Sequence, residues 1–361
     1  MPRVERVLFV YLDAFAWRFF EQHATHPLLD RARRDGLVLE LTSQFPSTTA
    51  AHTTTLHSGL PVGLHGVYEW FVLEPSLDRL IAPLLFSYAG EAERDTLLLA
   101  GLAADAVFPT ETLHLRLTEA GVHSVAVMPA SIARSVTNRA LLRGAECIAA
   151  RGAPDALARA CTALAAYDRV HATVYLPTFD ALMHKVGPDA PAARAELVSL
   201  LDAVAAALPR VPADTLVLIG TDHGMARVSP ERTAYVNVVW PELASQLRHG
   251  ADGKPLAPAG SCRDLFLHVL SGHVDDVVGE LSERLADVAD VVDTRSLVDE
   301  GAFGTEVCDT FLARLAEVAV LPRPGEAAWW LEAGRFEQTF YGQHGGCSAD
   351  ETEIPLLALV N

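Results

Sequence analysis

Two short segments pair a carboxylate with an imidazole at a spacing that suits a metal ion. In the first, Asp180 and His184 stand four residues apart, so a helix would place both side chains on one face. In the second, Asp222 and His223 are adjacent, and Gly224 permits a tight bend directly after them. Taken alone, the first segment also fits a surface ion pair and the second an ordinary polar turn. Together they offer the nitrogen and oxygen ligands that zinc binds.

A hydroxyl-rich segment, FPSTTAAHTTTLHSGL, occupies residues 45–60. Pro46 and Ser47 are expected to end an extended stretch, so that Thr49 begins a helix running to about Ser58. The N-terminus of a helix presents free N–H groups and partial positive charge, which favour an anion. A hydroxyl at that position could attack phosphorus, although an ordinary N-cap has the same appearance.

The elements that must position these residues follow an alternating pattern. Short apolar or β-branched runs predict buried strands, and Ala/Leu-rich stretches with 3.6-residue periodicity predict helices between them. We therefore expect an α/β fold with a mostly parallel central sheet and helices on both faces. The predicted strands are residues 7–12, 36–41, 124–128, 172–176 and 215–219, and the predicted helices are residues 155–166 and 192–207.

Three acidic residues, Asp13, Asp180 and Asp222, each come at or just after the end of a predicted strand. Sites in such sheets lie beyond the carboxyl ends of the strands, so the three should converge at one edge. His344 precedes two glycines and a terminal apolar run, and could return to the same edge. Buried together without metal, these charges would be costly, so two divalent ions are expected: zinc, with manganese or iron as alternatives. The candidate groups are Asp13, Thr49, Asp180, His184, Asp222, His223 and His344.

Composition narrows the class of partner and compartment. A formal net charge of −18 argues against binding of nucleic-acid polymers but not against a small phosphate ester. The sequence shows no apolar run long enough for a membrane span. The apolar run near the N-terminus ends at Asp13 without a cleavage site, so it reads as a first strand rather than a signal peptide, and a cytoplasmic location is expected. A homodimer is compatible with the sequence, which shows no interface.

The chain changes character after about residue 230. Residues 231–335 contain the strand-like run LFLHVL, an acidic helical stretch at residues 274–285 and a second apolar run at residues 316–321. We expect a catalytic core formed by residues 1–230 together with 336–361, and a small α+β insertion at 231–335 that could close over the substrate.

With these motifs in view, the chain resembles the alkaline phosphatase superfamily, and within it the type I phosphodiesterase/nucleotide pyrophosphatase family. The family's nucleophile motif, approximately F-P-T-x-T-F-P-N-H, aligns with residues 45–53 and puts the nucleophile at Thr49. A downstream [ST]-G-x-x-P-x-x-H-G element matches Ser58-Gly59 and His65-Gly66, with the proline one place early at Pro61.

Three later motifs complete the resemblance. The family's P-D-x-x-x-H-x-x-G-P is matched from Asp180 to Pro188, with Phe179 in place of the first proline, S-D-H-G-M by Thr221 to Met225, and H-G-G by His344 to Gly346. The resemblance implies two metal sites. One would be held by Asp180, His184 and His344, and the other by Asp13, Asp222 and His223, with Thr49 bridging toward it.

The resemblance also implies a reaction: hydrolysis of a phosphodiester or pyrophosphate through a phospho-threonine intermediate. The family's asparagine, which hydrogen-bonds a phosphoryl oxygen, is replaced by His52, so substrate preference is less constrained than reaction type. Tyr68, Trp70 and Phe71 could stack on a nucleobase, or could instead pack a core or lid. Alternatives within the superfamily are a phosphomonoesterase, a phosphonate hydrolase or a phosphomutase. A non-catalytic phosphate-binding protein is disfavoured because Thr49 is intact.

Overall fold

The structure is a computed structural model that describes residues 4–361. It comprises two compact units, each assembled from separate segments of the chain. The first contains the chain up to Ser43, Thr110–Met225 and Ala349–Asn361, and the second contains Gln44–Pro109 and Ala226–Ser348. Across the described residues, no helix has the length and apolar character needed to cross a membrane.

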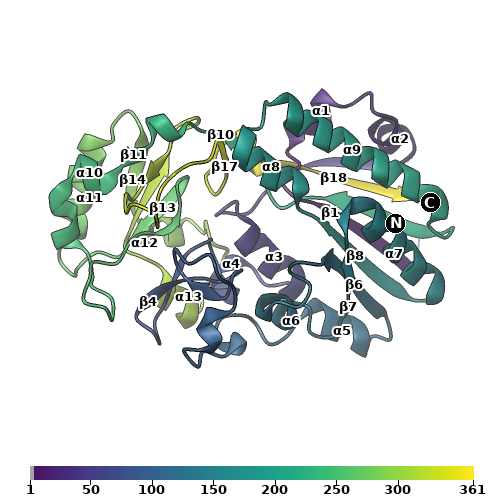
Figure 1. Cartoon of the computed structure of the whole chain (residues 1–361), viewed down its shortest axis with the longest axis horizontal. Coiled ribbons are helices and arrows are strands. Elements are labelled where there is room, and N and C mark those ends of the chain that lie inside the picture. The colour runs from purple at the N-terminus through teal and green to yellow at the C-terminus, as the bar shows by residue number, and fades with distance from the viewer. Residues whose placement is uncertain (1–3) are drawn as a thin grey trace. The chain divides into compact units, whose positions relative to one another are not determined.

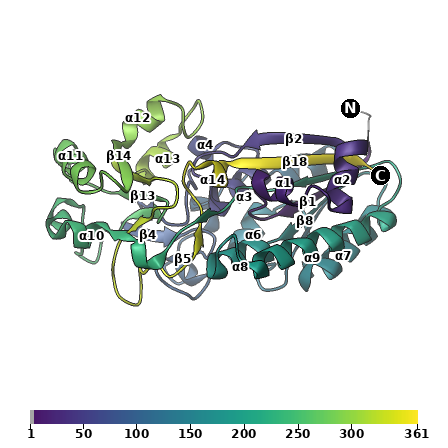
Figure 2. The ribbon, with the colours of Figure 1, turned by 90° about the horizontal axis from the view of Figure 1, so that it is seen from above.

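A seven-stranded sheet forms the centre of the first unit, in the order β2-β18-β9-β1-β8-β6-β7. From β9 to β7 all neighbouring strands are parallel. β18 runs antiparallel to both β9 and β2, and Figure 2 shows β18 beside β2. The expected α/β class and mostly parallel sheet are therefore confirmed. The strands are β1 (Arg6–Leu12), β2 (Leu37–Thr42), β6 (His123–Pro129), β7 (Glu146–Ala150), β8 (Val170–Leu176), β9 (Thr215–Gly220) and β18 (Glu353–Val360).

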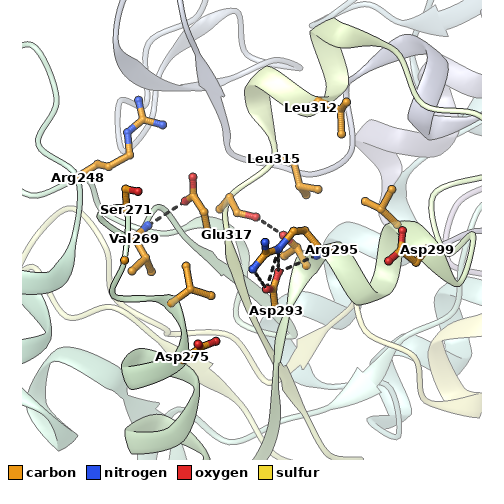
Figure 3. A pocket seen from close by; sticks show the side chains of 15 residues that line it. Arg248, Val269, Ser271, Asp275, Asp293, Arg295, Asp299, Leu312, Leu315 and Glu317 are labelled. Carbon is orange, nitrogen blue, oxygen red and sulfur yellow. Dashed lines mark hydrogen bonds and ion pairs between the residues drawn. The ribbon is translucent and has the colours of Figure 1, made fainter.

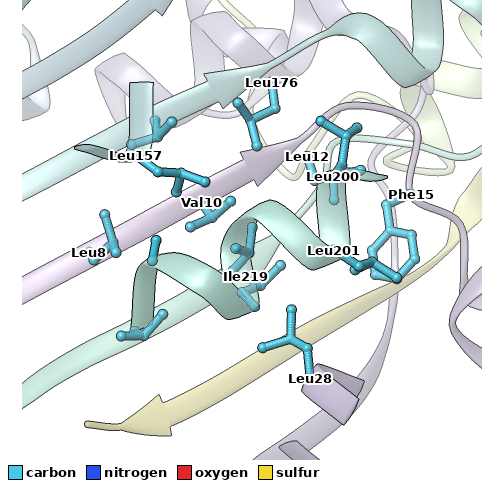
Figure 4. Packing of buried hydrophobic residues seen from close by; sticks show 14 of the residues in the cluster. Leu8, Val10, Leu12, Phe15, Leu28, Leu157, Leu176, Leu200, Leu201 and Ile219 are labelled. Atoms are coloured by element: carbon cyan, nitrogen blue, oxygen red, sulfur yellow. The ribbon is translucent and has the colours of Figure 1, made fainter. Parts of the chain in front are cut away.

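Helices cover both faces of this sheet because successive strand residues point to opposite sides. On one face, Leu8, Val10 and Leu12 of β1 pack against α7 (Gly152–Ala166) and α9 (Pro191–Ala207), two helices that lie side by side (Figures 1 and 4). On the other face, Ala126 and Met128 form a smaller cluster beside α6. The remaining helices of this unit are α1 (Trp17–Gln22), α2 (Pro27–Asp35), α5 (Leu113–Glu119), α6 (Val136–Leu141), α8 (Thr178–Val186) and α14 (Ala349–Thr352).

The second unit is built on a four-stranded antiparallel sheet in the order β12-β13-β15-β14, with α11 packed against β14 and β15. Its principal elements are β12 (Ala259–Ser261), β13 (Asp264–Leu267), α11 (Val274–Arg284), β14 (Ala289–Asp293), α12 (Thr294–Asp299), α13 (Asp309–Arg314) and β15 (Val318–Pro322). Small sheets pair β3 (Val72–Glu74), β4 (Arg79–Ala82) and β5 (Ser87–Tyr88), then β10 (Ala226–Arg227) with β17 (Gly342–Gln343), and β11 (Ala234–Tyr235) with β16 (Ala328–Trp329). Three short helices, α3 (Thr49–Ser58), α4 (Val62–His65) and α10 (Val236–Val239), complete it.

The observed division of the chain differs from the expected core of 1–230 with 336–361 and insertion of 231–335. Residues 44–109 join the second unit because their backbone bonds to it: the Gly63 N–H donates to Phe303, the Gly63 carbonyl accepts from Cys308, and the Gly260 N–H donates to Phe71. These bonds join positions far apart in the sequence, so they cannot be predicted from the local pattern of apolar and polar residues.

Candidate metal and nucleophile site

The acidic ends of three adjacent strands meet in the first unit. β1 lies between β8 and β9 in register, so Asp13, which follows β1, stands beside the residues that follow β9. The Nε2 atom of His223 lies 3.7 Å from Asp13 Oδ1 and 3.2 Å from Asp222 Oδ2. All three side chains are buried.

Backbone and side-chain donors fix the orientation of Asp222. Its Oδ1 accepts hydrogen bonds from the Ala14 N–H, at 3.3 Å, and from the Thr221 hydroxyl, at 3.1 Å. Its carbonyl accepts from the Ser43 hydroxyl at 2.7 Å. These contacts turn Oδ2 toward His223, as a ligand position requires.

Position 224 must be a glycine because there is no room for a side chain. A Cβ at Gly224 would lie 2.1 Å from the Asp350 carbonyl oxygen, and the Gly224 N–H donates to Glu351 at 2.8 Å. The loop therefore sits directly on the start of α14. His223 Nδ1 lies 2.8 Å from the Gly224 carbonyl and donates to it, which turns Nε2 toward the two carboxylates.

The electrostatics of this cluster are unfavourable without a cation. The pKa of Asp13 is raised well above its ordinary value, first by burial and then by the nearby charges of Asp222 and Asp180. Asp13 Oδ1 is buried and receives no hydrogen bond from the described residues. Carboxylates this close repel one another unless a positive charge stands between them. The ligand atoms of Asp13, Asp222 and His223 all lie within 4.8 Å of one another, so these residues fit a divalent cation.

One residue of this site was not foreseen from the sequence. Tyr175, on β8, donates its hydroxyl proton to Asp13 Oδ2 at 2.5 Å. The pKa of Tyr175 is raised, by burial and by the Asp13 charge, so the phenol stays protonated and remains a donor. Its place in the sheet could have revealed it. Tyr175 pairs with Tyr11, which lies two residues before Asp13, and it belongs to β8, a strand whose end is predicted to carry ligands.

The structure also brings Asp180 and His184 together. Asp180 and His184 lie on α8 one turn apart, with Asp180 Oδ2 3.4 Å from His184 Nε2, as their spacing predicted. Both side chains are largely buried, and the Asp180 charge reaches Asp13 strongly enough to raise its pKa. The first unit thus brings together the acidic strand ends, as expected.

In the second unit, α3 begins at Thr49 and ends at Ser58, the bounds expected from the sequence. Thr48 stands at the N-cap in an extended conformation, and Gly59 closes the helix with a left-handed φ of 74°. The first N–H groups of a helix have no partner within it, so Thr49 lies where an anion is favoured. His52 is half-buried in the first turn.

His344 is tied to the segment that precedes Thr49. Its Nδ1 lies 3.1 Å from the Ser47 carbonyl and donates to it. Ser47 also donates its hydroxyl proton to the Gly346 carbonyl at 2.7 Å. The Ser47 N–H donates to the Gly345 carbonyl at 3.3 Å, and the Gly345 N–H donates to the Ser47 hydroxyl at 3.2 Å. The late H-G-G motif and the nucleophile motif are therefore one local structure.

His65, in the motif that ends with His65-Gly66, has a structural role. Its Nδ1 accepts from the Val67 N–H at 3.1 Å, so its Nε2 donates to the Thr55 hydroxyl of α3 at 3.0 Å. Burial, and then the Arg314 charge, lower the pKa of His65 to about 3, so the ring is neutral. Arg314 in turn donates to the Gly66 carbonyl. This arrangement locks α4 against α3, and thereby supports Thr49.

The three aromatic residues considered for substrate stacking differ in exposure. Tyr68 is fully buried, with edge-on contacts to Phe266, Phe303 and Phe311, so it belongs to the core and is unavailable to a substrate. The alternative core interpretation therefore applies to Tyr68. Trp70 is 36% exposed, whereas Phe71 is half-buried and stacks on Trp329.

The second unit also contains a cavity of about 680 Å³ beside α11, α12 and α13, which none of the predicted site residues lines (Figure 3). Its two arginines already have carboxylate partners: Arg295 pairs with Asp293 at 2.5 Å and Arg248 with Asp78 at 3.6 Å. It therefore lacks the uncompensated positive charge that a phosphate ester would need.

Comparison with known families places the chain among the phosphoesterases of the alkaline phosphatase superfamily. The model of the type I phosphodiesterase/nucleotide pyrophosphatase family matches residues 7–346, and the chain belongs to this family. It is accordingly a hydrolase of phosphoric ester bonds. No curated protein matches the chain.

Solved structures share the fold. Murine ectonucleotide pyrophosphatase/phosphodiesterase 5, as an inactive threonine-to-alanine variant in complex with AMP, aligns with a TM-score of 0.71 and 17% identity, over 98% of this chain and 88% of its own. The human counterpart aligns with a TM-score of 0.71 and 16% identity, over 98% and 87%. Phosphonoacetate hydrolase from Sinorhizobium meliloti 1021, in complex with phosphonoformate, aligns at 0.69 and 15% identity, over 99% and 90%.

Proposed function

We propose that the protein hydrolyses the phosphodiester or pyrophosphate bond of a small, nucleotide-like substrate, with Thr49 as the nucleophile. The observation that carries the proposal is the buried Asp13–Asp222–His223 cluster, whose Asp13 oxygen receives no donor from the described residues. One ion would be held by these three residues and by Thr49. The other would be held by Asp180, His184 and His344. The mixed nitrogen and oxygen ligands favour zinc, with manganese or iron as alternatives.

Bound divalent ions would lower the pKa of the attacking hydroxyl and neutralise charge on the phosphoryl group. Thr49 Oγ1 forms the bond to phosphorus as the leaving oxygen departs, which produces phospho-threonine. Water then attacks that phosphorus, releases the phosphoryl product and restores the hydroxyl. The N–H groups at the start of α3 and the His52 side chain hold a non-bridging oxygen.

The inactive relative supports this assignment, because it loses activity through a threonine-to-alanine change and binds AMP. A second candidate function, phosphonate hydrolysis, is favoured by the similarity to the phosphonoacetate hydrolase with phosphonoformate bound. Attack by Thr49 on a phosphonate would use the same residues, so the substrate screen must separate the two.

The test begins with metal content, followed by turnover of bis-p-nitrophenyl phosphate, p-nitrophenyl phosphate and phosphonoacetate with Zn²⁺ and then Mn²⁺. About two metals per chain and a preference for the diester are expected. Thr49→Ala should abolish turnover and leave metal bound. Thr162→Ala is the matched control, because the Thr162 hydroxyl bonds only its own helix, to Ala158 at 3.0 Å. Substantial turnover in Thr49→Ala protein would refute the nucleophile, and phosphonoacetate as the preferred substrate would establish the second candidate.

A further inference from the structure

One arginine of the first unit, Arg18 on α1, contacts three segments that are separate in the sequence. Its Nη2 donates to the Met225 carbonyl at 2.9 Å, its Nη1 lies 3.4 Å from Asp189 Oδ1, and its Nε lies 3.3 Å from Asp350 Oδ1. The guanidinium also lies over the ring of Phe19, 4.6 Å from the ring centroid. A planar guanidinium has donors in several fixed directions, so it can join such segments at a defined geometry.

The first contact lies at the loop of residues 221–225, which carries two candidate metal ligands. Met225 ends this loop and is buried, so the carbonyl that accepts from Arg18 belongs to an enclosed part of the chain. The residues just before Arg18 are also bonded to the loop, since the Phe15 N–H donates to the Thr221 hydroxyl at 3.0 Å. The start of α1 and the ligand loop are therefore held together at more than one point.

The second contact, Asp189, follows the helix that carries Asp180 and His184. Only Gly187 and Pro188 separate Asp189 from the end of α8, and both are buried. The Gly187 N–H is bonded back into the helix, and the proline ring fixes φ at the next position. Asp189 is therefore tied closely to α8, and a contact to it restrains that helix.

The third contact, Asp350, lies in α14, the helix on which the ligand loop already rests. Below the guanidinium, Phe19 meets the Phe179 ring edge-on, with the ring centroids 5.2 Å apart. Phe179 directly precedes Asp180, so α1 packs against the ligand-bearing part of α8 as well. Arg18 thus completes a junction between the ligand loop, α8 and α14.

The two ion pairs of Arg18 are too exposed to contribute much energy by attraction alone. The side chains of Asp189 and Asp350 are 46% and 48% exposed, and pairs of this kind are worth little in water. The bond to the Met225 carbonyl is different, because it joins a charged donor to a buried acceptor. The contribution of Arg18 is therefore directional.

We propose that Arg18 is a positioning residue: it holds the loop of Asp222 and His223 at a fixed place relative to the helix of Asp180 and His184. The inference rests on the proposed function in one respect, that these four residues are metal ligands. Arg18 acts on them through the Met225 carbonyl and through Asp189.

Charge and position predict opposite effects of removing Arg18. A positive charge near a cation site disfavours the cation, so loss of that charge alone would raise zinc affinity. Loss of the bond to the loop would let Asp222 and His223 reorient, which would lower zinc affinity. Outer partners of metal ligands affect metal affinity by roughly 10–100-fold, and we expect a loss of roughly 10-fold, because Arg18 reaches the ligands through the backbone.

The test compares Arg18→Ala with the matched control Arg33→Ala in the full-length protein. Arg33 lies on the neighbouring helix α2 and also stands over a phenylalanine ring, that of Phe20 at 4.8 Å, but within residues 4–361 it has no bond to the ligand loop or to α8. Zinc affinity, measured by competition with a chelating dye, should fall by roughly 10-fold in Arg18→Ala and stay at the wild-type value in Arg33→Ala.

Hydrogen exchange of the metal-free proteins gives a second measurement that does not depend on zinc. Residues 221–225 should exchange faster in Arg18→Ala than in wild-type protein or in Arg33→Ala. Added methylguanidinium can occupy the space left by the Arg18 side chain, so it should restore part of the zinc affinity and slow this exchange in Arg18→Ala. A general loss of packing would not respond to it.

Each alternative outcome has a distinct meaning. A rise in zinc affinity in Arg18→Ala would overturn the proposal, because Arg18 would then act through its charge. Equal losses in both alanine variants, or unchanged affinity and exchange in Arg18→Ala, would also overturn it. If Arg18→Ala does not fold, Arg18→Lys replaces it, with a smaller loss expected and no loss overturning the proposal. Absence of diester turnover in wild-type protein that binds zinc refutes the proposed function alone.

Discussion

Removal of the Tyr175 hydroxyl tests the metal site without touching a ligand. Tyr175→Phe deletes the donor that stands 2.5 Å from Asp13 Oδ2 and keeps the ring, which packs 5.0 Å from the ring of Tyr11. Asp13 is 1% exposed, so water does not readily replace the lost donor. The variant therefore isolates one hydrogen bond to one candidate ligand.

The expected magnitude follows from two effects that act on Asp13. Loss of an outer hydrogen bond to a metal ligand weakens metal binding by roughly 10–100-fold, or about 1.4–2.7 kcal/mol. The Tyr175 hydrogen bond also lowers the pKa of Asp13, so its loss raises that pKa further. A raised carboxyl pKa means that a proton competes with the metal over a wider pH range. The deficit in zinc affinity should therefore grow as the pH falls.

The assay is a zinc competition titration at several pH values, together with kcat/KM at limiting and saturating zinc. Tyr167→Phe is the matched control, since Tyr167 is exposed at the end of α7 and stacks on His123. Saturating zinc should restore most of the turnover of Tyr175→Phe. Unchanged zinc affinity, or a loss that is the same at every pH, would refute the role given to this hydrogen bond.

Three further predictions concern the framework around the site. Arg314→Ala leaves Glu74 buried without its partner at 3.1 Å, so the free energy of unfolding should fall by about 3–5 kcal/mol in urea titrations; a loss under about 1 kcal/mol would contradict the buried ion pair. His268 is fully buried, its ring nitrogens have no hydrogen-bond partner among the described residues, and burial lowers its pKa to about 3. Because its pKa is depressed, unfolding takes up a proton below the unfolded value of about 6.5, and stability falls as the pH drops toward 3 with a slope of up to about 1.4 kcal/mol per pH unit. His268→Leu should flatten that slope in unfolding titrations across this pH range, and an identical slope would show that His268 does not cause it. Gly224→Ala forces a Cβ to within 2.1 Å of the Asp350 carbonyl, so zinc affinity and melting temperature should both fall, and wild-type values for both would mean that the loop relaxes freely.

Local patterns in the sequence were sufficient for the elements that carry the candidate ligands. A parallel strand buried on both faces is a continuous apolar run, so β1, β8 and β9 were legible, and the residues at their ends had to share one edge. The start of α3 at Thr49 was equally local, because it depends on the proline and hydroxyl residues immediately before it.

Long-range packing decided what the sequence alone left open. The contact from Tyr175 to Asp13 spans 162 residues, and it depends on the register of β1 against β8, which the local sequence pattern does not specify. The same holds for the placement of residues 44–109 in the second unit and for the burial of Tyr68, where an aromatic run is compatible with both a core and a binding surface. Periodicity reports which side of its own element a residue faces. The identity of the group it meets there depends on how separate elements pack, which only the tertiary structure specifies.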